Sequence, residues 1–215
     1  MILVNSFDGY RAAWGPLAHS FEKYWPDHPS ITFVTETLDP PIGNMAVKTG
    51  PCSCWADRML VAMRVMGDVI LYMQEDYWLT HTIDTGRVME LAGYVRNGLA
   101  DRIQLRAGWN HQVPDGPAGF DSSLLKLASS SPYRTSLQAS LWSKGALSSL
   151  LHSGDSVWDF ERKRNKDTRG MAVYGVKESV IHYPMFIVRG HWTKHARAYA
   201  EREGLDVDFT REPGE

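Results

Sequence analysis

The sequence of 215 residues predicts an α/β fold in which helices flank a mostly parallel central sheet. Three observations support this fold class. Helical and extended patterns alternate through the N-terminal part of the chain. The extended segments are unbroken apolar runs, which are typical of parallel strands covered on both faces. Polar clusters follow two of these runs, and sheets of this kind bind ligands beyond the carboxyl ends of their strands.

The chain opens with a strand, a helix and a second strand. Met1–Asn5 is an apolar run that leads into the polar loop Ser6–Gly9. Over Tyr10–Tyr24 apolar residues recur at helical spacing, and Pro26 ends the segment. Ile31–Thr35 is β-branched and aromatic, which favours a strand.

A loop, a helix and a central strand complete the alternation. Proline and glycine residues predict a long loop over Pro40–Pro51. Trp55–Val65 has an apolar face at helical spacing and leads into Val69–Met73, which has the length of a buried strand. Gln74–Asp76, directly after this strand, is the second polar cluster.

The second half of the chain is more mixed. We expect strands at Arg102–Leu105, Leu124–Leu127, Thr135–Trp142 and Ser179–Ile181. Asn110–Gly119 is rich in proline and glycine and predicts a loop. We expect helices over Val88–Val95, from the cap Ser143 to Leu151, from about Val157, and up to Glu203 with Gly204 beyond its end. No repeat, low-complexity tract or linker interrupts the chain, which predicts a single domain over residues 1–215.

The composition is that of an ordinary globular protein, with 43% hydrophobic and 22% charged residues. The net charge of −2 disfavours a protein that coats nucleic acid, although a local basic patch is compatible with it. Eight tryptophans are the less ordinary feature, and they suggest a site that packs rings or sugars.

The cysteines and the N-terminus favour a cytoplasmic protein. Cys52 and Cys54 are one residue apart, a poor geometry for a mutual disulfide and a weak zinc signal, so we expect reduced thiols. Met1–Val4 is too short for a secretory signal, and no apolar run is long enough to span a bilayer.

Glu75 and Asp76 follow the central strand, where carboxylates cost free energy unless something pairs with them. A divalent cation that carries a diphosphate would pair with them, because Mg²⁺ and Mn²⁺ prefer oxygen ligands and share them with phosphates. In the alternative interpretation, Asp76 caps the next turn and Glu75 faces water. Residue spacing alone leaves both interpretations open.

Several segments, in this order, resemble the small glycosyltransferases of the GT-A fold that are known from bacteria, phages and large viruses. They are Ser53–Arg58, Val69–Leu79, Thr135–Trp142, Val157–Glu161, Arg189–Trp192 and Glu203–Phe209. Each is weak alone, whereas the ordered set spans nearly the whole chain. The resemblance implies that residues 1–80 bind a nucleotide-sugar, with a UDP-sugar favoured, and that residues 81–215 bind the acceptor.

The resemblance also implies a donor site. Members of the family hold Mn²⁺ or Mg²⁺ through an Asp-x-Asp motif, where this chain has Gln74-Glu75-Asp76. Asp76 would be the metal ligand, and Glu75 would act through water or on a sugar hydroxyl. The residues expected to contact the nucleotide are Ser6, Phe7, Asp8, Asp57 and Arg58. A guanidinium suits a diphosphate or a base edge, although a surface ion pair between Asp57 and Arg58 is the alternative.

Resemblance further implies a catalytic base after the turn at Ser153–Asp155. In inverting enzymes of the family a carboxylate from such a loop deprotonates the acceptor hydroxyl, and here Asp159 is the candidate with Glu161 as its alternate. A helix-capping Asp159 and a solvated Glu161 are the structural alternative. A third metal ligand would come from His182 or His191, with His182 preferred.

Five basic residues lie within Arg162–Arg169, namely Arg162, Lys163, Arg164, Lys166 and Arg169. Such a run is commonly a solvated surface. Beside the expected acceptor loop it would instead contact a phosphate of the donor, of a lipid or of a nucleic-acid backbone.

The favoured function is transfer of a sugar from a nucleotide-diphosphate donor to a hydroxyl of a glycan or of a hydroxylated DNA base. The alternatives are a nucleotidyltransferase and a non-catalytic nucleotide-sugar-binding module. The tryptophans fit the favoured function as a ring-lined cleft, with Trp55 and Trp78 beside the donor strand and Trp142, Trp158 and Trp192 in acceptor segments.

Overall fold

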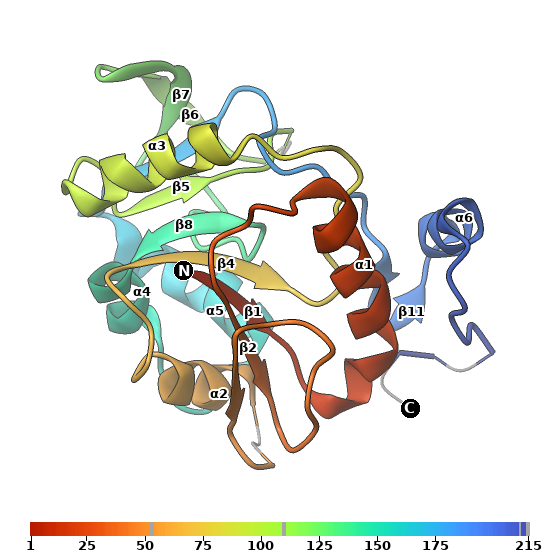
Figure 1. The fold of residues 1–215 in the computed structure, drawn as a ribbon. Helices are drawn as coiled ribbons and strands as arrows, with labels where there is room; N and C mark the ends of the chain where they lie inside the picture. Colours follow the sequence, from red (N-terminus) through yellow and green to blue (C-terminus); the bar gives the residue numbers. More distant parts are fainter. Residues whose placement is uncertain (52–53, 109–110, 211, 214–215) are drawn as a thin grey trace.

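The computed structural model describes residues 1–51, 54–108, 111–210 and 212–213. Within them one nine-stranded sheet runs in the order β3-β2-β1-β4-β8-β5-β9-β7-β6 (Figure 1). The strands are β1 (Ile2–Asn5), β2 (Ile31–Thr35), β3 (Met45–Lys48), β4 (Val69–Gln74), β5 (Arg102–Gln104), β6 (Pro114–Ala118), β7 (Asp121–Leu127), β8 (Ser140–Ser143) and β9 (Val173–Val176).

Helices cover both faces of the sheet. They are α1 (Trp14–Tyr24), α2 (Trp55–Ala62), α3 (Thr85–Arg96), α4 (Lys144–Leu150), α5 (Val157–Lys163) and α6 (Lys194–Glu203), with short 3₁₀ helices η1 (Asp8–Ala13) and η2 (Arg164–Thr168). A separate hairpin pairs β10 (Ile187–Val188) with β11 (His191–Trp192). Among the described residues, no helix has the length and apolar character needed to cross a bilayer.

The sheet confirms the predicted fold class. Strands β3, β2, β1 and β4 are parallel neighbours, and β5 and β9 form a further parallel pair. Only β7 and β8 run against the other seven strands of this sheet in the described residues. The antiparallel strand β8 joins the N-terminal parallel half to the C-terminal half.

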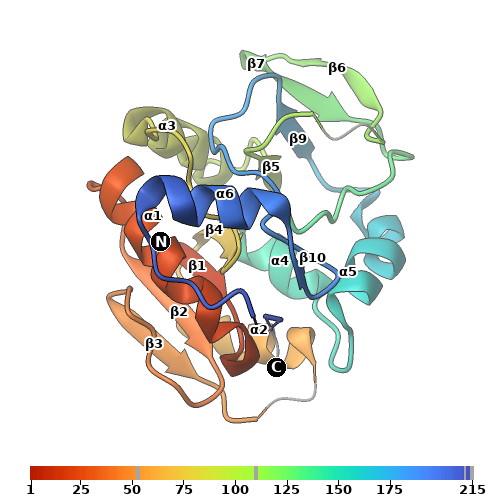
Figure 2. The same cartoon turned by 90° about the vertical axis from the view of Figure 1, so that its right-hand side faces the viewer.

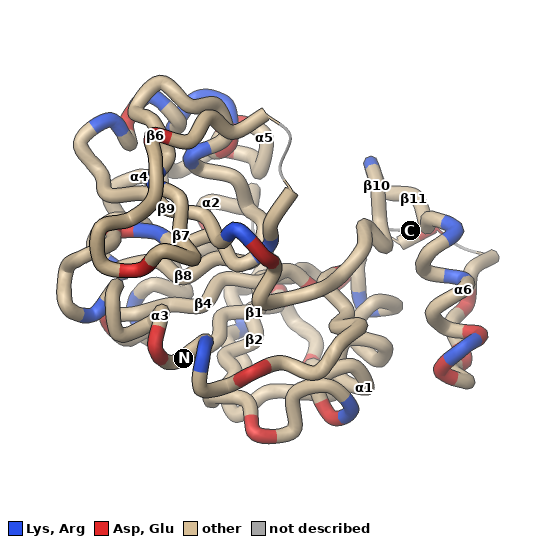
Figure 3. The backbone as a smooth tube through the Cα atoms, turned by 90° about the horizontal axis from the view of Figure 1, so that it is seen from above, with Lys and Arg blue, Asp and Glu red and all other residues tan. Residues whose placement is uncertain are grey.

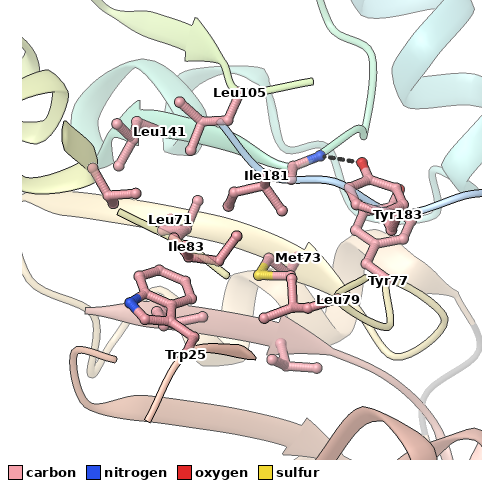
Figure 4. Packing of buried hydrophobic residues seen from close by; sticks show 14 of the residues in the cluster. Trp25, Leu71, Met73, Tyr77, Leu79, Ile83, Leu105, Leu141, Ile181 and Tyr183 are labelled. Atoms are coloured by element: carbon pink, nitrogen blue, oxygen red, sulfur yellow. Dashed lines mark hydrogen bonds between the residues drawn. The ribbon is translucent and has the colours of Figure 1, made fainter. Parts of the chain in front are cut away.

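Alternating residues of the central strands build two cores. Ile2 and Val4 of β1 pack into the core under α1 and α3, whereas Leu3 packs into the core under α2, α4 and α5. Strand β4 repeats the pattern, with Leu71 in the first core (Figure 4) and Ile70 in the second. A period of two along buried strands requires cover on both faces, which the six helices provide.

Most predicted elements in the first half are confirmed, and two edge strands were missed. The predicted loop Pro40–Pro51 contains β3, and the predicted loop Asn110–Gly119 contains β6. Both strands lie at the edges of the sheet and are largely exposed, and β6 pairs with β7 through shifts of register. Edge strands tolerate proline and need no apolar pattern, so the sequence signal is weak.

One predicted strand is right only in part, and another is wrong. Only the last residues of Thr135–Trp142 belong to β8, since the Leu137 N–H and the Thr135 hydroxyl bond to α5 instead. Ser179–Ile181 is not a strand, because the N–H groups of Val180 and Ile181 both donate to the carbonyl of Leu105. The caps were predicted correctly: the Ser143 side chain accepts the Ala146 N–H, and Gly204 is left-handed with φ 66°.

Of the five tryptophans predicted to line a cleft, Trp55 and Trp158 line the pocket described below, whereas Trp78, Trp142 and Trp192 do not. Trp25, Trp78 and Trp142 are fully buried in the cores, and the Trp78 indole donates to the carbonyls of Ala13 and Glu75. Only Trp158 is largely exposed among the described tryptophans. Trp109 and Cys52 lie outside the described residues, and Cys54 is a free thiol.

The C-terminal helix is tied to the first helix through one buried carboxylate. Helix α6 crosses in front of α1 in Figure 2, and Glu203 at its end accepts hydrogen bonds from Lys23, His19 and Tyr24. Figure 3 shows Lys and Arg positions interspersed with Asp and Glu positions along the backbone, including on α6. The near-neutral net charge therefore combines positions of both signs that are spread along the chain.

Candidate functional site

A pocket of about 830 Å³ lies at the carboxyl ends of β1 and β4. The register pairs Asn5 with Gln74, so that Ser6 and Glu75 emerge together at the same edge of the sheet. The remaining walls come from the start of α2, residues 133–138, helix α5 and the β10–β11 hairpin. The two polar clusters predicted after strands therefore meet, as α/β topology requires.

Glu75 and Asp76 form the acidic floor of this pocket. Their exposed fractions are only 6% and 8%. Burial raises the pKa of Glu75, and the neighbouring Asp76 raises it further, while Arg58 and Ser6 act in the opposite direction. Burial also raises the pKa of Asp76, against a hydrogen bond from the backbone of Ile187 in the hairpin. Two such carboxylates become fully ionised most readily when a cation joins them.

Arg58 places a buried cation in the same pocket. It belongs to the first turns of α2, is 9% exposed, and its guanidinium carbon lies 5.3 Å from the centre of the Phe7 ring. Its Nε atom is buried without a hydrogen-bond partner, and the Oδ1 atom of Asn5 is in the same condition. Such groups cost roughly 1–3 kcal/mol each when left unpaired. A polar ligand that bonded to both would recover this free energy.

The two candidate bases on α5 have different environments. Glu161 lines the pocket, accepts the Leu137 N–H at 2.7 Å, and has a pKa that burial raises. Asp159 does not belong to the lining. Its carboxylate bonds to the N–H and hydroxyl of Ser156 in a capping box and pairs with Lys163 at 2.8 Å, and Lys163 and Ser156 lower its pKa.

Of the predicted nucleotide contacts, Ser6, Phe7 and Arg58 line the pocket, whereas Asp8 and Asp57 do not. Asp8 accepts hydrogen bonds from the backbone of residues 36–38 and from the Thr37 hydroxyl. It therefore holds the loop after β1 against the loop after β2. Asp57 accepts a hydrogen bond from the Cys54 thiol at 3.1 Å.

The predicted histidine ligands lie outside this pocket. The His182 ring contacts the His81 ring at 4.8 Å, and burial lowers its pKa. His191 is exposed and pairs with Glu212 at 3.2 Å. Within the described part of the chain, no three His, Cys, Asp or Glu side chains gather as a metal cluster.

The residues that line the pocket nevertheless fit a hard divalent cation such as Mg²⁺. Mg²⁺ commonly binds proteins through one or two carboxylates, with water and substrate phosphate as its other ligands. Glu75 and Asp76 supply two buried carboxylates at the floor of a pocket large enough for such a substrate. Both carboxylates face the volume in which Arg58 also lies.

Two of the five basic residues in the run Arg162–Arg169 form ion pairs, and a third contacts an aromatic ring. Lys163 pairs with Asp159, and Arg164 forms a two-atom contact with Asp155 at 2.7 and 3.1 Å. Arg162 lies over the Trp158 ring at 5.4 Å.

Sequence reasoning missed Asn5 and the hairpin turn Arg189–Gly190, which both line the pocket. Asn5 could have been found, since it is the polar end of a buried strand. Arg189 and Gly190 have φ of 53° and 81°, as a two-residue hairpin turn requires. The turn has a sequence signal in Gly190, but β10 and β11 are too short to show an extended pattern.

No protein-family model matches the sequence, and no curated protein matches it. Solved structures do share its fold. The glycosyltransferase TarS of S. aureus, residues 1–349, superposes with a TM-score of 0.54 at 11% identity, over 86% of this chain and 59% of that one. CMP:2-keto-3-deoxy-manno-octonic acid synthetase complexed with CTP superposes with a TM-score of 0.51 at 11% identity, over 95% and 96%.

At these identities the similarity establishes the fold alone. The fold is one that glycosyltransferases and nucleotidyltransferases use. This chain spans 59% of the length of TarS 1–349. TarS 1–349 has also been solved in complex with UDP-GlcNAc.

Proposed function

We propose that the protein is a glycosyltransferase that moves a sugar from a nucleotide-diphosphate donor, with a UDP-sugar favoured, to an acceptor hydroxyl. One observation carries the proposal. The buried Arg58, with an unpaired Nε, shares one pocket with the buried carboxylates Glu75 and Asp76. A diphosphate that carries a divalent cation matches both, since its oxygens pair with the guanidinium and its cation pairs with the carboxylates.

The donor half of the pocket would hold the nucleotide. Glu75 and Asp76 would hold Mg²⁺ or Mn²⁺, which supplies positive charge next to the leaving diphosphate. Arg58 would donate to the diphosphate oxygens as negative charge develops on them. Asn5, Ser6 and Phe7, at the end of β1, would contact the base and ribose. The fold shared with TarS, which has been solved with UDP-GlcNAc, supports this assignment.

Glu161 is the better candidate for the base. The acceptor oxygen would attack C1 of the sugar while the bond from C1 to the diphosphate oxygen breaks, and Glu161 would take the hydroxyl proton. A carboxylate with a raised pKa is suited to this step near neutral pH. Leu137 orients Glu161 through its N–H, whereas the oxygens of Asp159 are occupied by Ser156 and Lys163.

A nucleotidyltransferase is the second candidate, favoured by the superposition on a CTP-bound synthetase over nearly the full length of both chains. Such an enzyme attacks phosphorus and releases pyrophosphate. The segment Ser6–Tyr10 argues against a nucleotidyltransferase. Its single glycine is Gly9, so it lacks the glycine-rich sequence that commonly cradles a triphosphate.

The test is thermal unfolding with nucleoside diphosphates, nucleotide-sugars and CTP, each with and without Mn²⁺. A ligand at a hundred times its dissociation constant adds about 2.7 kcal/mol to the free energy of unfolding. We expect a UDP-sugar with Mn²⁺ to raise Tm, Arg58→Ala to abolish the rise, and the exposed Arg64→Ala to retain it. If no nucleotide raises Tm, the glycosyltransferase proposal fails. Pyrophosphate release from CTP would favour the second candidate.

A further inference from the structure

Trp158 has an unusual position for a large aromatic side chain. It lies in the first turn of α5, lines the pocket, and is 53% exposed. Every other Trp, Tyr and Phe among the described residues is buried or partly buried. The remaining described tryptophans are at least half-buried, in the cores or at their edges. The exposure of Trp158 is therefore unusual for a tryptophan in this fold.

Two more exposed apolar side chains line the same pocket. Met185 and Val188 are 37% and 42% exposed and belong to the segment that forms the β10–β11 hairpin. Trp158 comes from a helix nearly thirty residues earlier in the chain, so two separate segments bring apolar groups to one opening. Single exposed apolar residues are ordinary, whereas several around one pocket mark a binding surface.

The spacing on α5 links this apolar surface to the proposed chemistry. Trp158 and Glu161 are three residues apart, which places them on the same side of the helix, and both line the pocket. Arg162, four residues after Trp158, lies over the indole ring at 5.4 Å and braces it. A molecule that stacks on this indole therefore lies at the pocket that Glu161 also lines.

We propose that Trp158, Met185 and Val188 form the acceptor subsite, and that the acceptor is a carbohydrate whose ring stacks on Trp158. This inference rests on the proposed glycosyl transfer. A pyranose ring has an apolar face of C–H groups bordered by hydroxyls, which matches an exposed indole in a pocket that the polar side chains of Gln138 and Glu161 also line.

The charges around the subsite favour a carbohydrate over a nucleic acid. A polynucleotide needs unpaired cations for its phosphates. Of the basic residues in Arg162–Arg169, Lys163 at the end of α5 and Arg164 at the start of η2 are already paired with Asp159 and Asp155. Arg162 is engaged with Trp158, and the net charge of the protein is −2.

The experiment uses the full chain labelled with 5-fluorotryptophan, and Trp158→Phe assigns the Trp158 fluorine resonance. Probes are neutral disaccharides (maltose, cellobiose, lactose and chitobiose) at millimolar concentration, and a single-stranded oligothymidine. We expect at least one disaccharide to shift the Trp158 resonance. Trp158→Ala lacks this resonance, so its affinity and that of the native protein are measured by calorimetric titration, and the substitution should weaken binding about tenfold. Met89→Ala, which removes an exposed apolar side chain on α3, should leave it unchanged.

The proposal is overturned if no disaccharide shifts the Trp158 resonance, if only the oligonucleotide shifts it, or if Trp158→Ala binds the disaccharide as tightly as the native protein. Folding of Trp158→Ala is checked by its Tm, which should be nearly native because the indole is half exposed and the Ser156 cap remains. The nucleotide-dependent rise in Tm tests the donor site separately. If disaccharides bind and nucleotides do not, the carbohydrate subsite stands and the glycosyltransferase assignment fails.

Discussion

The backbone N–H of Leu137 donates to the Glu161 carboxylate at 2.7 Å, and this bond joins the segment before β8 to helix α5. It explains two results together. Leu137 is withdrawn from the strand that its sequence predicts, and Glu161 is held at the wall of the pocket. The Thr135 hydroxyl reinforces the junction by donating to the carbonyls of Phe160 and Glu161.

Replacement of Glu161 separates the two candidate bases. We expect Glu161→Gln to lower kcat by about 10²–10⁴-fold, the usual contribution of a general base, with nucleotide binding retained. Asp159→Asn should lower Tm through the lost helix cap and leave kcat nearly native. Steady-state kinetics and thermal unfolding of both variants check this. A large loss of kcat in Asp159→Asn alone would return the role to Asp159.

The same base predicts a pH dependence of activity. Burial raises the pKa of Glu161, and only its ionised form accepts the proton. The rate kcat should therefore increase as the pH rises through that raised pKa, above the ordinary carboxyl range near about 4. Glu161→Gln should remove this rising limb from its residual activity. A limb that persists unchanged in the variant would assign the titration to another group.

The acidic floor predicts a linkage between pH, divalent cations and stability. The pKa values of Glu75 and Asp76 are raised in the folded protein, so above about pH 4 the folded state binds more protons than the unfolded state. Their contribution to the free energy of unfolding therefore falls as the pH rises. Mn²⁺ should stabilise the native protein more at pH 8 than at pH 5.

Asp76→Asn provides the comparison, measured by urea unfolding at both pH values with EDTA or with Mn²⁺. The variant should lose most of the Mn²⁺ effect and, without metal, should be relatively more stable at pH 8. Asp68→Asn, which changes an exposed carboxylate before β4, is the matched control and should behave as the native protein. Equal stabilisation of Asp76→Asn and native protein by Mn²⁺ would contradict a metal site here.

Replacement of Asn5 should affect stability and nucleotide binding in opposite directions. Its Oδ1 is buried without a partner, so Asn5→Leu removes an unpaired polar group and should leave Tm unchanged or raise it. Nucleotide affinity should fall at the same time. Ser20→Ala is the opposite control, because the buried Ser20 hydroxyl donates to the Leu17 carbonyl, so it should lower Tm and spare binding. Calorimetry of both variants measures Tm and nucleotide affinity. An unchanged nucleotide affinity in Asn5→Leu would show that Asn5 does not contact the nucleotide.

Glu203 predicts acid sensitivity of the contact between α6 and α1. Burial alone would raise its pKa, but donors from Lys23, His19, Arg202 and Tyr24 hold it at about 2. A depressed folded pKa stabilises the protein above about pH 4, and the stabilisation is lost as the pH falls toward 2. Glu203→Gln should lower the free energy of unfolding at pH 7 by roughly 1.5–3 kcal/mol. Urea unfolding at pH 7 and pH 3 measures both effects, and a variant deficit that persists at full size at pH 3 would refute the linkage.

Much of the candidate site at the ends of β1 and β4 could be predicted from the sequence. Apolar runs located β1 and β4, and the segments that follow them contain Ser6, Phe7, Glu75 and Asp76, which all line the pocket. The rule that parallel strands end at one edge brings these residues together without knowledge of any side-chain contact.

The sequence also determined the fold class and the caps, because apolar periodicity and residues such as Ser143 and Gly204 act within a few residues of themselves. Only the tertiary structure placed Glu161 in the pocket wall and Asp159 outside it. It also buried Trp78 and Trp142 and left Trp158 exposed in the pocket lining. These outcomes depend on partners far away in the chain, such as Leu137 for Glu161 and the hairpin for the pocket wall. Local sequence patterns cannot predict such contacts, because burial and hydrogen bonding between distant segments depend on how the whole sheet assembles.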